Sequence, residues 1–156
     1  MSSEKLRSGD TAPEFVLENQ DGLQVSFRTL LKKPVILYFF PAAGSPGCTK
    51  EAADFQDHIE EFNAAGYKII GISPDPVERL KDFQEAHELT FDLLSDPDMK
   101  VHKLYGAFGE KSIYGRLYKG VLRSTMIINS QGKIQEALYN VKATGHTQML
   151  LRKIGN

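Results

Sequence analysis

The chain has 156 residues, of which 41% are hydrophobic and 25% are charged, a composition typical of one globular domain and not of a disordered chain. Lys and Arg total 19 and Asp and Glu total 20, giving a formal net charge of -1, so we expect no binding to nucleic acid or to an anionic membrane surface. The longest apolar run, 35–40, is far shorter than the ~20 residues that cross a bilayer.

The cysteine content and the first residues indicate the compartment. Residues 1–10 lack the apolar stretch of a secretory signal. The single cysteine, Cys48, excludes an intrachain disulfide and with it a disulfide-stapled secreted fold. We therefore expect a cytoplasmic protein in which Cys48 is either an inert packing residue or the centre of the chemistry.

The first part of the chain predicts a hairpin and then a central strand. Residues 1–7 are expected to be a loose lead-in. Apolar segments at 15–17 and 23–27 flank the turn signal 19–22 (NQDG), which predicts an N-terminal β-hairpin. Residues 35–40 are apolar at every position, as is typical of a strand buried on both faces.

Helices and strands alternate in the middle of the chain. Apolar residues recur every three or four positions from Ala52 to Phe62, which predicts an amphipathic helix of about 18 residues ending near Gly66. A buried strand is expected at 67–73 and a helix from Pro76 to about His87. A strand at 91–94 and a short helix at 96–104 follow.

The last third predicts a loop, a hairpin and a helix. Residues 106–120 carry four glycines among aromatics, which indicates a long surface loop, either a plain connection or a mobile flap beside Cys48. Strands at 124–129 and 134–139 form a hairpin, and a helix covers 144–154. This order predicts an α/β fold with a mixed central β-sheet flanked by helices, the thioredoxin-like architecture, as a single domain over 1–156.

Cys48 is expected where the buried strand has ended and the long helix begins. The N–H groups of a first helical turn have no helical partner, and the macrodipole presents its positive end there. Such a place stabilises a thiolate, which is the nucleophilic form of cysteine. A lone cytosolic cysteine is more often buried and inert, and the position by itself does not decide between the two.

The residues around Cys48 resemble a known signature. The pattern Pro41-x-x-x-Ser45-x-x-Cys48 is similar to the Pro-x-x-x-Thr/Ser-x-x-Cys motif of the peroxiredoxin family, and the run from Phe40 to Ala52 resembles its Q-type, or bacterioferritin comigratory, subfamily. The similarity covers about residues 8–155 and includes four further matches: Gly9-Asp10-x-Ala12-Pro13, Gly71-Ile72-Ser73-x-Asp75, Arg123-Ser124-Thr125 and Gly132-Lys133-Ile134.

The resemblance implies a thiol-dependent peroxidase that reduces hydrogen peroxide and organic hydroperoxides, with no cofactor and no metal. Cys48 would be the peroxidatic cysteine, which becomes a sulfenic acid. The Ser45 hydroxyl would hydrogen-bond the peroxide. Pro41 would shape the loop and shield the thiolate from water. Arg123 would stabilise the thiolate and the charge on the leaving oxygen. Glu51, one turn after Cys48, would orient Arg123 through a charge-assisted pair.

Each of these residues also has a plain structural interpretation. Ser45 is a good helix cap or turn residue, and Pro41 is a common strand terminator. Arg123 without the resemblance would be a surface residue on an edge strand, and Glu51 complements a helix dipole without further function. The four histidines lack ligand-like spacing and are interpreted as surface or packing residues: His58, His87, His102 and His146.

The chain departs from many Q-type enzymes because it has no resolving cysteine. Ala53 stands where many carry one, and 80–86, where others carry it, contains none. The resemblance therefore implies a one-cysteine variant, recycled by an external thiol such as thioredoxin, glutaredoxin or a low-molecular-weight thiol. It also implies a monomer or weak dimer.

Two other functions compete with this hypothesis. A thioredoxin-like thiol–disulfide oxidoreductase or redox relay is expected to carry Cys-x-x-Cys, and the chain has Cys48-Thr49-Lys50-Glu51 instead. A non-catalytic binding module on the same scaffold would make Cys48 dispensable.

Overall fold

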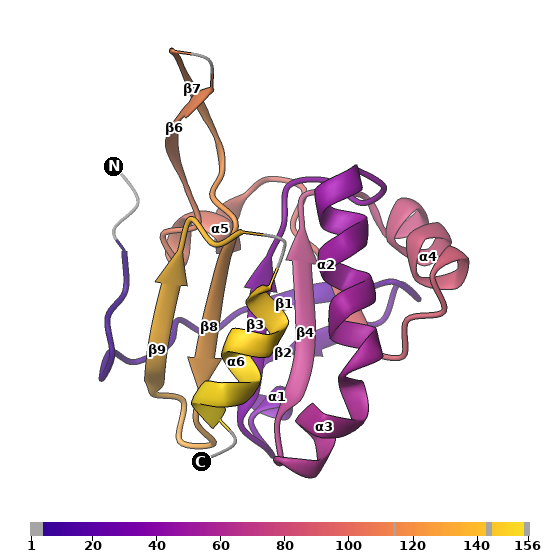
Figure 1. Cartoon of the computed structure of the whole chain (residues 1–156), viewed down its shortest axis with the longest axis vertical. Coiled ribbons are helices and arrows are strands. Elements are labelled where there is room, and N and C mark those ends of the chain that lie inside the picture. Colours follow the sequence, from indigo (N-terminus) through magenta and orange to yellow (C-terminus); the bar gives the residue numbers. More distant parts are fainter. Residues whose placement is uncertain (1–4, 114, 143–144, 155–156) are drawn as a thin grey trace.

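The computed structural model describes residues 5–113, 115–142 and 145–154, and within these it contains one seven-stranded sheet and a separate two-stranded hairpin (Figure 1). The strands are β1 (Val16–Asn19), β2 (Gln24–Ser26), β3 (Val35–Phe39), β4 (Lys68–Ser73), β5 (Asp92–Ser95), β6 (Phe108–Ile113), β7 (Arg116–Val121), β8 (Ser124–Ile128) and β9 (Ile134–Tyr139). The helices are α1 (Phe27–Leu30), α2 (Pro46–Asp57), α3 (Ile59–Ala64), α4 (Val77–Ala86), α5 (Lys100–Leu104) and α6 (His146–Ile154). No helix in these ranges is long and apolar enough to cross a membrane.

The main sheet has the order β2-β1-β5-β4-β3-β8-β9. β3 pairs in parallel with β4 and antiparallel with β8, so the sheet is mixed. All five residues of β3 are buried, as the unbroken apolar run predicts. The mixed central sheet between helices confirms the predicted α/β fold class.

Side chains of β3 alternate between two hydrophobic clusters, one on each face of the sheet. Leu37 and Phe39 belong to the cluster that includes α1 and α5. Tyr38 belongs to the other cluster, which includes apolar residues of α2, α3, α4 and α6. Cys48 is a member of this second cluster, so the cysteine lies on the face of the sheet that α2 covers (Figure 1).

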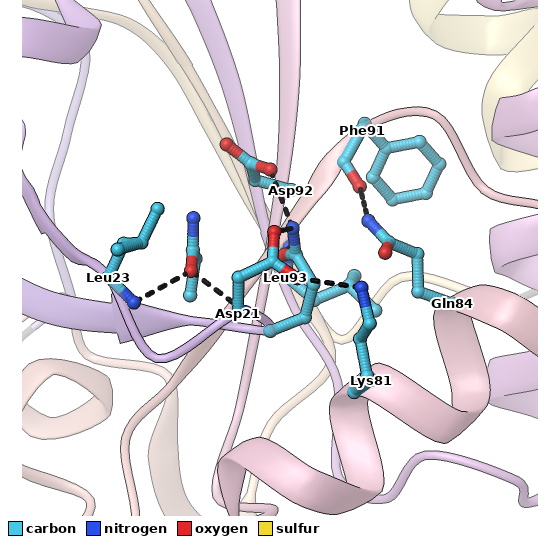
Figure 2. Close-up of polar contacts among 9 residues, drawn as sticks. Asp21, Leu23, Lys81, Gln84, Phe91, Asp92 and Leu93 are labelled. Carbon is cyan, nitrogen blue, oxygen red and sulfur yellow. Dashed lines mark hydrogen bonds and ion pairs between the residues drawn. The ribbon is translucent and has the colours of Figure 1, made fainter.

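The expected N-terminal hairpin is present as β1 and β2, and its turn is tied to α4 and β5 (Figure 2). Asp21 Oδ1 lies 2.7 Å from Lys81 Nζ, and Gln20 Nε2 donates to Asp92 Oδ1 at 3.0 Å. Residues 1–4 of the expected lead-in lie outside the described residues. Leu6 is bound to β9, because its N–H donates to the Tyr139 hydroxyl at 2.8 Å.

The predicted helix of about 18 residues is two helices, α2 and α3, with a break at His58. The His58 ring Nδ1 lies 2.9 Å from the Asp54 carbonyl oxygen, which is the acceptor that the His58 N–H would use in a continuous helix. That N–H bonds the Phe55 carbonyl instead, at 3.2 Å, with φ at -111°. Competition from the side chain for the helical acceptor therefore explains the break.

The segment 106–120 is not the expected surface loop, because most of it forms the antiparallel strands β6 and β7. The hairpin projects from the body of the protein (Figure 1). Gly109 and Gly120 pair with each other across its ladder. Gly106 and Gly115 have φ values of 74° and 77°, which glycine adopts without strain, so they serve turns at the two ends of β6. The glycines therefore mark a hairpin and its turns.

The C-terminal helix and the short helix begin later than predicted. α6 starts at His146, and the expected first residue, Thr144, lies outside the described residues. α5 starts at Lys100 because the Asp96 carboxylate accepts the N–H groups of Val101 and His102 at 3.2 and 2.8 Å, leaving 96–99 as the turn that leads in.

Gly71 lies in β4 at a place where the core leaves no room for a side chain. It pairs with Tyr38, and a Cβ at Gly71 would lie 3.0 Å from the Tyr38 ring and 3.0 Å from a Leu93 methyl group. Gly71→Ala should lower the free energy of unfolding by roughly 1–3 kcal/mol, because the buried strand leaves no room for the methyl group. Gly120→Ala is the control, since its Cβ would meet its nearest neighbour at an ordinary 3.5 Å. Equal stability of the two variants in chemical denaturation would contradict this packing.

Candidate active site

The loop that leads to Cys48 is anchored on Asp75. The Ala43 N–H donates to Asp75 Oδ2 at 2.6 Å, and the Ser73 hydroxyl donates to the same oxygen at 2.8 Å. The Asp75 carbonyl accepts the Ser95 hydroxyl at 2.6 Å, which ties the anchor to β5. The sequence predicts no role for Asp75, although it belongs to the motif Gly71-Ile72-Ser73-x-Asp75. The role of its side chain as an anchor follows only from the structure, in which the loop toward Cys48 passes the end of β4.

Cys48 is 1% exposed and lies in the first turn of α2. Pro46 has no N–H, and the first helical bond runs from the Thr49 N–H to the Ser45 carbonyl at 2.9 Å. The N–H groups of Gly47 and Cys48 therefore precede the intrahelical ladder. The positive end of the helix dipole favours negative charge at this place, and here that charge would be a thiolate.

Ser45 occupies the N-cap position, but its side chain makes no capping bond. Its hydroxyl donates to the Ala42 carbonyl at 3.0 Å instead. The capping interpretation is thus wrong for the Ser45 side chain. With its proton committed to Ala42, the hydroxyl oxygen still has lone pairs with which to accept a hydrogen bond.

Arg123 joins Cys48 to Glu51. Its Nη2 donates to Cys48 Sγ at 3.4 Å, and its Nη1 lies 2.7 Å from Glu51 Oε1. Arg123 lies in the short link between β7 and β8, and 75 residues separate it from Cys48 in the sequence. The structure therefore brings these three predicted residues into one cluster.

Two of the three members of the cluster, Cys48 and Glu51, are buried, and Arg123 is partly exposed. Glu51 is fully buried, and burial raises its pKa to about 7 although the charge and hydrogen bond of Arg123 oppose the rise. For Arg123, burial lowers the pKa, but the charges of Glu51 and Cys48 outweigh it and the net shift is upward. Among the described residues, neither Glu51 Oε2 nor the Tyr38 hydroxyl has a hydrogen-bond partner. Burial, followed by the charges of Glu51 and Cys48, raises the Tyr38 pKa well above its usual value.

Pro41 is the fifth predicted residue, and it lies beside the cluster and not in it. Pro41 and Arg123 line the same pocket, with a volume of about 240 Å³, together with Lys111, Val121, Leu122, Asn140 and Val141. The pocket therefore reaches the cluster through Arg123.

The histidines lie apart from this cluster except for His146. His146 is buried, and its Nε2 lies 2.8 Å from Thr125 Oγ1; burial and then the Arg123 charge lower its pKa to about 4. His102 and Asp96 form a fully buried pair at 2.6 Å, while His87 is exposed. Within the described ranges, no three His, Cys, Asp or Glu side chains are grouped to hold a metal.

The fold and this site define a class: a thioredoxin-fold protein with one buried cysteine at a helix N-terminus beside an arginine. The profile of the AhpC/TSA family matches residues 8–137. A peroxiredoxin of Mycobacterium tuberculosis is 50% identical over 150 residues, 96% of either chain. Peroxiredoxin Bcp of Escherichia coli K12 is 40% identical over 146 residues, 94% of either chain. A cysteine-to-serine mutant of Xanthomonas campestris peroxiredoxin Q is 30% identical with a TM-score of 0.86, covering 99% of this chain and 98% of that one.

The chain therefore belongs to the AhpC/TSA family, among its peroxiredoxins of Bcp or Q type, as a member with one cysteine. It is a thiol-dependent peroxidase, and the alternative of a thioredoxin-like thiol–disulfide oxidoreductase is not favoured.

The raised pKa of Glu51 predicts a pH-dependent contribution to stability. A carboxyl group whose pKa is raised by folding binds more protons in the native state, so its contribution is complete below about pH 4.5 and is lost as the pH rises to about 7. The unfolding free energy of the wild type minus that of Glu51→Gln should fall across this window, by at most roughly 3 kcal/mol at about 1.4 kcal/mol per pH unit.

Denaturant titrations of both proteins from pH 4 to pH 8 would measure this difference. Buried His146 has a lowered pKa and so contributes the opposite slope, but both proteins carry it and the difference removes it. A difference that stays flat or rises with pH would mean that Arg123 keeps Glu51 ionised throughout.

Proposed function

We propose that Cys48 is the peroxidatic cysteine, that it reduces hydrogen peroxide and organic hydroperoxides, and that an external thiol recycles it. The observation that carries this proposal is the Arg123 guanidinium, whose Nη2 lies 3.4 Å from Cys48 Sγ at the N-terminus of α2. The guanidinium and the helix N-terminus both place positive charge beside the sulfur, where the attacking nucleophile carries negative charge.

The chemical step is a two-electron oxidation of sulfur. The Cys48 thiolate attacks the terminal oxygen of the peroxide; the S–O bond forms as the O–O bond breaks. Cys48 becomes a sulfenic acid, and the leaving alkoxide, or hydroxide from hydrogen peroxide, takes a proton from solvent to give an alcohol or water. Negative charge moves from sulfur to the leaving oxygen, so a donor that serves both positions stabilises the transition state.

Arg123, Ser45 and Pro41 surround this step in the proposal. The Arg123 guanidinium has five N–H donors in one plane, so Nη1 can remain on Glu51 while Nη2 follows the charge from sulfur to oxygen. The Ser45 oxygen accepts a hydrogen bond from the peroxide O–H, since its own hydroxyl donates to the Ala42 carbonyl. Pro41 lies on the substrate side because it lines the pocket with Arg123.

Glu51 is a positioning residue in this proposal. It is buried one turn beyond Cys48 and lies 2.7 Å from Arg123 Nη1, which fixes one edge of the guanidinium. The same carboxylate would compete with the thiolate for the positive charge. A Glu51 that is partly protonated near neutral pH, as its pKa of about 7 allows, leaves more of that charge to Cys48.

The second half of the cycle needs a thiol from another molecule. The sequence has one cysteine, and neither Ala53 nor 80–86 supplies a resolving thiol. An external thiol attacks the sulfenic sulfur, releasing water and forming a mixed disulfide; a second thiol then releases reduced Cys48. We propose thioredoxin, glutaredoxin or a low-molecular-weight thiol for this role, acting on a single-domain cytoplasmic protein that is a monomer or weak dimer.

The proposed function is tested most directly on Cys48 itself. Pre-reduced protein mixed with one equivalent of hydrogen peroxide should give a dimedone adduct on Cys48 far faster than free cysteine does, and excess peroxide should give the sulfinic acid. Mass spectrometry is a suitable measurement, since the chain has no tryptophan to report the reaction by fluorescence. Cys48→Ser should keep the circular dichroism spectrum and lose peroxide turnover with an external thiol; turnover within tenfold of the wild type would refute the proposal.

Ala53→Cys tests whether the helix must open before a disulfide can form. Cys48 and Ala53 both lie in α2, and five residues of helix separate two Cα atoms by roughly 8 to 9 Å. A disulfide needs less than about 7 Å, so the first turns must unwind after oxidation. Oxidised Ala53→Cys should show an intrachain disulfide in a non-reduced digest together with lower helicity than its reduced form. A bridge without loss of helicity would contradict the continuous helix between the two positions.

A further inference from the structure

The pocket beside Arg123 contains a second cation that the reaction described so far does not use. Lys111 of β6 lines this pocket of about 240 Å³, to which Pro41 and Arg123 also belong. Its side chain reaches back along the hairpin, and Nζ donates to the Val121 carbonyl at 2.9 Å. A Cβ at Gly120 would lie only 3.5 Å from Lys111 Cε, which shows that the lysine stem crosses this glycine.

The charge of Lys111 is not neutralised by a neighbouring acid. Among the described residues, the polar contact of its ammonium group is the neutral Val121 carbonyl, and no carboxylate lies within ion-pair distance. Glu110 is the adjacent residue on β6, and strand alternation directs it to the opposite face of the hairpin. An ammonium group has three donors, so two remain beyond the one given to Val121.

We propose that Lys111 and Arg123 form a subsite for the carboxylate of a small hydroperoxide, so that the preferred organic substrate is a short carboxylic acid with the hydroperoxide on a nearby carbon. This inference rests on the proposed function of Cys48 and names the substrate class of the same site.

The place of the pocket limits the substrate. With a volume of about 240 Å³ it accommodates a small carboxylic acid. Arg123 lines the pocket and also contacts Cys48 Sγ, so a carboxylate there lies one guanidinium away from the sulfur. In this arrangement the hydroperoxide lies within a few bonds of the carboxylate.

The chemical step on such an acid is the one proposed above for Cys48. The Cys48 thiolate attacks the terminal oxygen of the acid's hydroperoxide, the O–O bond breaks, and the alkoxide takes a proton from solvent. The products are the sulfenic acid and the hydroxy acid, and the carboxylate is unchanged.

The test compares two hydroperoxides of similar shape and different charge. tert-Butyl hydroperoxide is neutral, and 2-hydroperoxy-2-methylpropanoate replaces one methyl group with a carboxylate, giving eight non-hydrogen atoms. Rate constants for oxidation of Cys48 are measured by rapid quench and mass spectrometry for the wild type, Lys111→Gln and Lys119→Gln. Lys119 is the matched control because it is an exposed lysine on β7 of the same hairpin and is not part of the pocket lining.

The rate ratio of the anionic to the neutral peroxide should fall about fivefold in Lys111→Gln, which is what loss of one charge–charge contact at ~4 Å in high dielectric amounts to. It should stay within twofold of the wild type in Lys119→Gln, and the hydrogen peroxide rate should stay within twofold in both. An unchanged ratio in Lys111→Gln, or an equal fall in Lys119→Gln, would overturn the subsite while hydrogen peroxide still oxidises Cys48. Absence of oxidation by all three peroxides in the wild type would instead overturn the proposed function, and the subsite with it.

Discussion

The antiparallel register between β3 and β8 determines whether the arginine and the cysteine can meet. Phe39 pairs with Ser124, so Arg123 lies level with the end of β3, where the chain turns into the loop toward Cys48. Successive residues of a strand point to opposite faces, and a slip of one position would carry Arg123 away from the face that α2 covers. The contact of 3.4 Å between Nη2 and Sγ therefore depends on the alignment of the central strands, which their fully buried apolar side chains enforce.

That alignment places one cation between two buried acidic groups, the Glu51 carboxyl and the Cys48 thiol. Desolvating ionised groups is costly, and a single guanidinium cannot fully compensate both a carboxylate and a thiolate. The site therefore favours protonation of Glu51, whose pKa rises to about 7, and it leaves Glu51 Oε2 and the Tyr38 hydroxyl without partners among the described residues. The buried Glu51 carboxyl and the two unpartnered oxygens lower the stability of the fold. Because Glu51 is then less often ionised, more of the Arg123 charge acts on Cys48.

Elements that depend on local sequence patterns could be predicted, whereas contacts that depend on strand pairing and on side-chain placement could not. The buried run 35–40 and a helix beginning near Cys48 could be predicted directly, because burial and helix entry leave patterns within a few residues. Arg123 was found through resemblance, since its distance to Cys48 depends on strand register. The β6–β7 hairpin was missed because paired Gly109 and Gly120 inside strands look the same in sequence as glycines in a loop. The His58 break was missed because it depends on where one ring nitrogen lies.

The first turn of α2 bears on both halves of the proposed cycle, the reduction of peroxide and the recycling of Cys48 by an external thiol. Gly47 is a poor helix former and the Ser45 side chain does not cap the helix, so the first turn is held weakly. The N–H groups of Gly47 and Cys48 have no helical acceptor and lie in the turn that holds the sulfur. The same weakness lowers the cost of opening the turn, which a 1% exposed sulfur requires before an external thiol can reach it. Asp75 anchors the loop at Ala43 and Glu51 is bound to Arg123, so the turn that would have to open lies between two anchored points.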